Sequence, residues 1–112
     1  MTIVIWILSG LASLAFLAAG GSKLAGAAPM VDAFAKLGVG QWFRYVTGLL
    51  ELTGAVGLLA PKYRFYAALL LAAVMVGAVA THLFIIGKSP AGAALLLVLV
   101  SVIAWLSHPA RV

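Results

Sequence analysis

Glu51 and His82 are the side chains in this 112-residue sequence whose types and positions could support acid–base chemistry. Glu51 stands inside the apolar run 44–60, and His82 stands late in the apolar run 64–87. Ionisable side chains at membrane depth are energetically costly and usually functional. A carboxyl and an imidazole at similar depth can exchange a proton, or act as general acid and base on a bound molecule. The alternative is that Glu51 only joins helices through a hydrogen bond or an ion pair.

The composition favours a membrane protein. Hydrophobic residues make up 66% of the sequence and charged residues 8%, and the mean hydropathy is +1.26. A soluble domain of this size cannot bury so much apolar surface, so the bilayer must act as the solvent. The net charge of +5 comes from Lys and Arg that flank the apolar runs, which indicates lipid headgroups as partners, with no role for nucleic acid. There is no cysteine, which excludes disulfides and thiolate metal sites in this sequence.

Four apolar runs are near the roughly 20 residues that a helix needs to cross the hydrocarbon. They cover residues 3–21, 44–60, 64–87 and 90–107. The short connections between the later runs make neighbouring helices antiparallel. The sequence therefore predicts an all-α membrane protein with a single integral membrane domain over residues 1–112. The predicted architecture is an up-down bundle of four transmembrane helices.

Residues 29–38 have a different pattern and predict a short amphipathic helix between the first and second spans. Apolar side chains recur on one helical face, at Met30, Val31, Phe34 and Leu37. Asp32 and Lys36 form an i,i+4 pair on the other side. Such a helix lies half-submerged at the membrane surface. It is either a surface-anchored linker or a lid over a cavity between the spans.

The polar residues gather in one half of the bilayer. At 1.5 Å per residue, Glu51 lies ~10 Å deeper than Arg44, and His82 and Ser13 lie ~7 Å and ~12 Å from the same membrane face. We therefore predict that Glu51 and His82 face the interior within ~8 Å of each other, close enough for a direct or one-water contact. They would be the catalytic pair. The predicted ligand-binding residues around them are Lys23, Arg44, Thr47, Ser13 and Thr81.

The same positions argue against a metal centre. Glu51 and His82 are too few ligands for a closed metal site. A haem with two histidine ligands would need both imidazoles on one iron, and His108 lies at the opposite membrane face from His82. We expect the chain to hold no metal and no cofactor of its own. If a cofactor binds, the candidate is a quinone.

Several motifs resemble those of the DoxX-like family over essentially the whole sequence. They are Ala19-Gly20-Gly21-Ser22-Lys23-Leu24, Gly48-x-x-Glu51-x-x-Gly54, Ala80-Thr81-His82-Leu83 and the Phe-x-x-Leu-Gly stretch at 34–38. The resemblance implies a bacterial inner-membrane protein with four helices and both termini in the cytoplasm, an orientation that the charge bias alone does not decide. The family takes its name from a membrane subunit linked to quinone-coupled oxidation of thiosulfate, and relatives have been placed in membrane oxidoreductase assemblies. The matched family positions are Lys23, Glu51 and His82.

Three functions follow as hypotheses. The first is binding of a lipophilic small molecule, such as a quinone or an isoprenoid, by this chain alone or as the membrane subunit of an oxidoreductase assembly. The second is proton-coupled export of the small multidrug type, although the carboxylate of those transporters lies in the first helix and this first helix has none. The third is a non-catalytic partner subunit. Expected partners are the bilayer, the lipophilic molecule, and an oxidoreductase or further copies of the chain. Whether the protein is an enzyme stays open.

Overall fold

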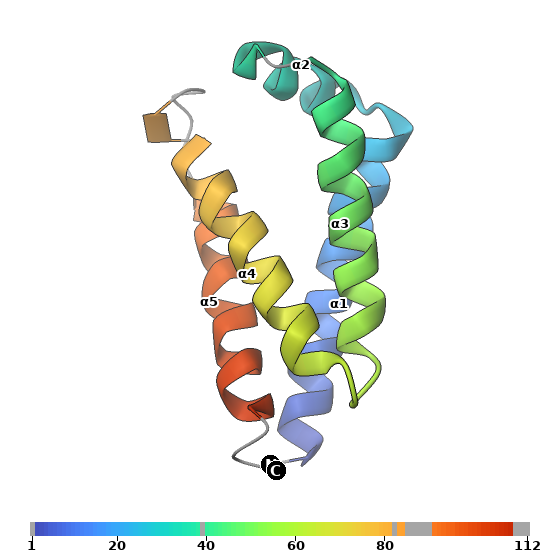
Figure 1. Ribbon diagram of the computed structural model, residues 1–112, viewed down its shortest axis with the longest axis vertical. Coiled ribbons are helices and arrows are strands. Elements are labelled where there is room, and N and C mark those ends of the chain that lie inside the picture. Colours follow the sequence, from blue (N-terminus) through green and yellow to red (C-terminus); the bar gives the residue numbers. More distant parts are fainter. Residues whose placement is uncertain (1, 39, 82, 85–90, 109–112) are drawn as a thin grey trace.

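The computed structural model describes residues 2–38, 40–81, 83–84 and 91–108. Within these residues the chain forms five α-helices and no β-strand, which confirms the all-α prediction. The helices are α1 (Thr2–Ala25), α2 (Ala28–Leu37), α3 (Trp42–Leu58), α4 (Arg64–Thr81) and α5 (Ala91–Ser107). The four longer helices run along the long axis of the molecule, and α2 lies across one end (Figure 1). The other end carries the turn between α3 and α4.

Two helices of the described chain are long and apolar enough to cross a membrane. They are α1, with 24 residues, and α4, with 18. The apolar helix α5 is shorter, with 17 residues. Helix α3 also has 17 residues, and it carries Arg44 and Glu51. Length and composition thus indicate a membrane protein, while the prediction of four crossings stays a prediction.

The predicted amphipathic helix is confirmed as α2. A proline lies in its first turn, where a backbone N–H has no acceptor within the helix, so the missing N–H of proline costs no hydrogen bond. The helix ends at Gly38, whose positive φ of 76° suits glycine and lets its N–H bond to the carbonyl oxygen of Ala35. Phe34 is buried, and its ring packs edge-on against Phe43 of α3, with ring centroids 6.0 Å apart. This contact places the apolar face of α2 on the beginning of α3.

Glycines allow the closest helix contacts. A Cβ on Gly20 of α1 would lie 2.8 Å from the carbonyl oxygen of Gly48 in α3. A Cβ on Gly54 of α3 would lie 2.5 Å from Leu71 of α4. Since no side chain fits at these positions, the backbones come together as they do in other membrane helix pairs. The α1–α3 contact is tight near the α2 end, whereas the α3–α4 contact is tight near the opposite end.

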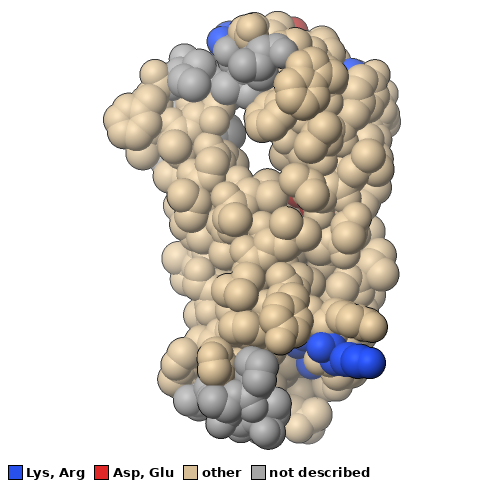
Figure 2. Space-filling model, in the orientation of Figure 1, with Lys and Arg blue, Asp and Glu red and all other residues tan. Residues whose placement is uncertain are grey.

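Among the described residues, the hydrophobic core cluster fills the half of the molecule near the α3–α4 turn. Its members are Ala12, Phe16, Ala55, Leu58, Ala67, Ala68, Leu71, Met75, Val100, Ile103 and Ala104. Among the described residues, α4 has no buried side chain after Met75 and α5 has none before Val100. Toward α2, the α4–α5 pair diverges from the α1–α3 pair (Figure 1). A space-filling view shows a hole through the molecule there (Figure 2). We call this hollow, which lies between α3 and α4 toward the α2 end, the interhelical opening.

Candidate functional site

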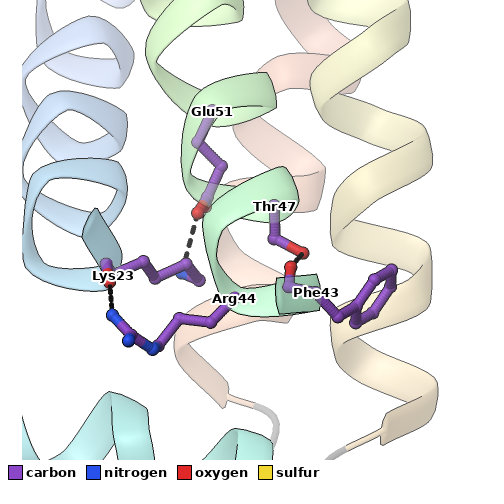
Figure 3. A network of polar contacts seen from close by, with 5 residues as sticks. All are labelled: Lys23, Phe43, Arg44, Thr47 and Glu51. Carbon is purple, nitrogen blue, oxygen red and sulfur yellow. Dashed lines mark hydrogen bonds and ion pairs between the residues drawn. The ribbon is translucent and has the colours of Figure 1, made fainter. Parts of the chain in front are cut away.

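A buried ion pair joins α1 to α3. The ammonium Nζ of Lys23 lies 2.7 Å from the carboxylate Oε1 of Glu51 (Figure 3). The Glu51 side chain is 1% exposed and the Lys23 side chain 13% exposed. Each charged residue follows a contact glycine by three positions, Gly20 in α1 and Gly48 in α3, so it shares that glycine's helix face. The close glycine contact therefore brings the two charges together.

The lack of a side chain at Gly48 makes room for Lys23. A Cβ at Gly48 would lie 3.2 Å from the Cβ of Lys23 and 3.1 Å from Leu24. The lysine stem can therefore cross α3 at this position and reach Glu51 one turn further along the helix. The Gly-x-x-Glu spacing in α3 thus has a local physical reason.

Arg44 forms a second part of the same polar network. It is 5% exposed, and its Nη1 donates a hydrogen bond to the backbone carbonyl oxygen of Lys23 (Figure 3). This carbonyl lies in the last turn of α1, where backbone oxygens lack i+4 helical partners, and it also accepts a hydrogen bond from the backbone N–H of Gly26 at 3.3 Å. Arg44 Nε donates to Gln41 Oε1 at 2.8 Å, and Gln41 Nε2 donates to the backbone oxygen of Val31 in α2 at 3.1 Å. The network therefore ties α2 and the end of α1 to the beginning of α3.

The Lys23–Glu51 pair lies where the hydrophobic core ends. Glu51 is one turn from Ala55, which belongs to the core, and one turn in the other direction from Thr47, which is half-buried. The side chains of Thr47 and Phe43 point from α3 toward α4 (Figure 3). Thr47 Oγ1 donates to the carbonyl oxygen of Phe43 at 2.9 Å, so its hydroxyl is engaged within its own helix. These two residues form the α3 side of the interhelical opening.

A family comparison identifies the chain. The model of the DoxX-like family matches residues 7–107. The chain belongs to the DoxX-like family. This match confirms the resemblance seen in the sequence motifs, and together with the apolar helices it indicates a membrane protein. No curated protein and no solved structure matches the chain.

Only some of the predicted site residues of this DoxX-like protein are brought together by the structure. Lys23, Arg44 and Glu51 belong to one connected network. Ser13 lies deeper in the core, where its Oγ donates to the carbonyl oxygen of Ala55 at 3.0 Å and links α1 to α3. Thr81 is half-buried in the last turn of α4. His82 lies outside the described residues, so its predicted contact with Glu51 stays a prediction.

One member of the network was missed at the sequence level. Gln41 uses both ends of its amide, accepting from Arg44 and donating to α2. The available signal was a polar residue three positions before a buried arginine, a spacing that places both on one helical face. A polar residue at this position is equally typical of a helix end at the membrane surface, so the sequence does not distinguish that role from a hydrogen bond to Arg44.

The arrangement can orient a polar group of a ligand, although it does not resemble a metal site. In the described part of the chain, no group of three or more His, Cys, Asp or Glu side chains is placed to hold a metal ion. Lys23 carries three N–H donors, of which one can serve Glu51. A second donor is available to a carbonyl or hydroxyl oxygen that reaches the pair. Lys23 and Glu51 could then act as hydrogen-bond donor and proton acceptor on the same molecule.

Proposed function

We propose that this DoxX-like protein crosses the membrane four times and binds a lipophilic small molecule in the interhelical opening. The molecule would carry one polar group, as a quinone or an isoprenoid alcohol does. The observation that carries this proposal is the buried Lys23–Glu51 pair at the boundary between a closed core and an open end. A mostly apolar site with a few convergent polar groups is the usual form of a small-molecule site.

Helix length and surface chemistry support the four crossings. The 17 residues of α3 or α5 extend to ~26 Å as a helix, close to the hydrocarbon thickness of ~30 Å. Large apolar side chains are exposed on all four longer helices, including Leu14 in α1, Leu49 in α3, Val76 in α4 and Leu95 in α5. These faces suit lipid. Four crossings place both termini on one side, and family resemblance favours the cytoplasmic side of the inner membrane.

The opening offers the ligand a route from the bilayer. Because α4 and α5 diverge from α1 and α3, a lipid-soluble molecule can enter sideways between α3 and α4 without crossing water. Its apolar body would lie against Phe43, the methyl group of Thr47 and the small side chains at the end of α4. Its polar end would accept a hydrogen bond from Lys23 beside Glu51. A quinone carbonyl satisfies this geometry, as does the hydroxyl of an isoprenoid alcohol.

Helix α2 would cover the end of the site. It is held by the Phe34–Phe43 ring contact and by the Gln41–Val31 hydrogen bond. Both contacts involve the beginning of α3, which also supplies the wall of the opening. The lid hypothesis for the amphipathic segment therefore fits its attachment.

Lipid analysis of the purified protein tests the proposal. The protein is extracted in mild detergent, and bound lipophilic molecules are identified by mass spectrometry against a detergent blank. Thr47→Trp fills the opening from α3 and should remove most of the bound compound. Thr53→Trp is the matched control, because Thr53 lies on the same helix, bonds its own backbone in the same way at 2.8 Å, and is exposed. Equal retention in the two variants, or no retention by the wild type, would show that the opening is not a ligand site.

Glu51→Gln separates a functional carboxylate from a structural one. The glutamine keeps an acceptor for Lys23 and removes the charge. If the pair orients the ligand, retention of the compound falls in this variant while the protein remains folded. If the pair only joins α1 to α3, retention is unchanged. Co-purification of a soluble oxidoreductase with the wild-type protein would assign it to a larger assembly.

A further inference from the structure

Arg44 and Glu51 hold the same lysine at its two ends. Arg44 Nη1 donates a hydrogen bond to the backbone carbonyl oxygen of Lys23, and Glu51 contacts the Lys23 ammonium at 2.7 Å (Figure 3). Arg44, Gly48 and Glu51 are buried on one face of α3, at positions i, i+4 and i+7. The lysine side chain begins beside Gly48, where an added Cβ would lie 3.2 Å from the Cβ of Lys23. Lys23 therefore bridges two turns of α3, ~10 Å along the helix, with a contact at each end.

The guanidinium of Arg44 is held by three neighbours. Its Nε donates to Gln41 Oε1 at 2.8 Å, and its central carbon lies 4.3 Å from the ring centroid of Tyr45. The third neighbour is the last turn of α1, where the backbone carbonyl groups carry a partial negative charge that favours a cation. Arg44 is 5% exposed, so little of its side chain is accessible to a ligand. Its contacts are with the protein itself.

Gln41 extends these contacts to α2. Its Nε2 donates to the backbone oxygen of Val31 at 3.1 Å, while its Oε1 accepts from Arg44. A continuous series of polar contacts thus begins at Val31 in α2, passes through Gln41 and Arg44, and reaches Lys23 and then Glu51. The docking of α2 and the geometry of the ion pair are linked through one glutamine and one arginine.

We propose that Arg44 is a positioning residue for Lys23, and that Gln41 makes this position depend on the docking of α2. The lysine ammonium is carried on a flexible four-carbon stem, so it meets Glu51 consistently only when the backbone of Lys23 is fixed. Arg44 fixes that backbone through the carbonyl oxygen and acts on a ligand only through Lys23. Displacement of α2 removes the support of Gln41 from Arg44 and weakens the ion pair. The inference rests on the proposed function for the role of the ligand, while the contacts that carry it are independent of any ligand.

A role of Arg44 in capping α1 is the alternative to be separated. A cation at the C-terminal end of a helix stabilises that helix, so the loss of Arg44 would lower stability in either case. The interaction free energy between Lys23 and Glu51 distinguishes the two roles. A capping residue changes the stability of the protein and leaves this interaction unchanged, whereas a positioning residue changes the interaction itself.

A double-mutant cycle measured in several backgrounds tests the proposal. The cycle combines Lys23→Met with Glu51→Gln, and the free energy of unfolding is measured by reversible denaturation in mixed micelles without added ligand. Arg44→Lys keeps the charge and loses the planar fork that serves two acceptors. In this background the coupling, expressed as an equilibrium constant, should fall about tenfold, the effect of one hydrogen bond from a charged donor. Gln41→Ala should lower the coupling less, because Arg44 keeps its bond to Lys23.

Ser13→Ala is the matched control background. The Ser13 hydroxyl also joins α1 to α3, through its bond to Ala55 at 3.0 Å, and it lies outside the series of contacts from α2 to Glu51. The coupling should be unchanged in this background. An equal fall in Ser13→Ala would mean that any loosening of α1 against α3 weakens the pair, and the proposal would be wrong.

Unchanged coupling in Arg44→Lys would overturn the positioning role and leave Arg44 as a cap of α1. If Arg44→Lys does not fold, Gln41→Ala decides, because Gln41 is half-buried and its loss leaves no charge unpaired. Unchanged coupling in Gln41→Ala would contradict the link to α2. Since no ligand is present in the cycle, a protein that retains no lipophilic molecule would refute the proposed function without changing these results.

Discussion

Removing the lysine of the Lys23–Glu51 pair should destabilise the protein more than removing both charges. At 2.7 Å and an effective dielectric constant near 20, the attraction between unit charges is about 6 kcal/mol, most of which desolvation offsets. Lys23→Met leaves a carboxylate that is 1% exposed without a partner, at an expected cost of about 3 kcal/mol. Glu51→Gln leaves the lysine with a neutral acceptor and partial access to water, at a cost of ~1 kcal/mol. Glu51→Ala removes the acceptor as well and should be worse than Glu51→Gln.

The double variant isolates the interaction. Lys23→Met combined with Glu51→Gln should cost ~2 kcal/mol, against about 4 kcal/mol for the sum of the single changes, which gives a coupling of about 2 kcal/mol. The free energy of unfolding is measured for all four proteins by reversible denaturation in mixed micelles, with helix content as the signal. If the destabilisation of the double variant equals the sum of the two single destabilisations to within ~0.5 kcal/mol, the two groups do not interact. The reasoning from the 2.7 Å distance would then be wrong.

Three further predictions concern the helix contacts. Gly54→Ala should lower the free energy of unfolding by ~1–3 kcal/mol, because the added Cβ would lie 2.5 Å from the buried Leu71. Gly10→Ala is the control: its Cβ would have no atom within 4 Å, so it should not destabilise the protein. Both are measured by the same denaturation assay. Gln41→Ala removes the hydrogen bond to the α2 backbone, so it should increase the rate of amide hydrogen exchange across α2. The exchange rates of the other helices should change little. An unchanged exchange rate in α2 would contradict this role of Gln41. Ser13→Ala should cost about 0.6 kcal/mol, the average for a hydrogen bond between membrane helices, and a change above ~2 kcal/mol would indicate a further role for the hydroxyl.

Much of the fold could be predicted because apolar runs and glycines mark the helices directly. The predicted amphipathic segment 29–38 and the observed α2 differ by one residue at each end, since Pro29 and Gly38 are local signals that do not depend on distant contacts. The divergence of α4 and α5 from the other helices could not be predicted. It depends on where tight contacts occur, and the sequence does not show that Gly48 faces α1 while Gly54 faces α4.

The positions of the candidate-site residues along their helices were predictable, but their partners were not. Rise per residue placed Glu51, Arg44 and Ser13 at their heights along the helices, and a basic partner for Glu51 was among the alternatives. The choice of Lys23 over Arg44 depends on helix rotation, which the Gly20–Gly48 contact fixes. Ser13 illustrates the same limit, because its bond to Ala55 follows from the direction in which it points from α1.

The central claim is that a lipophilic molecule binds in the interhelical opening beside Lys23 and Glu51. The most direct measurement is photolabelling of the reconstituted protein with a photoactivatable quinone analogue, followed by mapping of the labelled residues by mass spectrometry. The account predicts labels in segments 43–51 and 76–81 that disappear when excess unlabelled quinone is added and that are strongly reduced in Thr47→Trp. Labels confined to the outward faces of α1 and α5, or labels that unlabelled quinone does not displace, would contradict it.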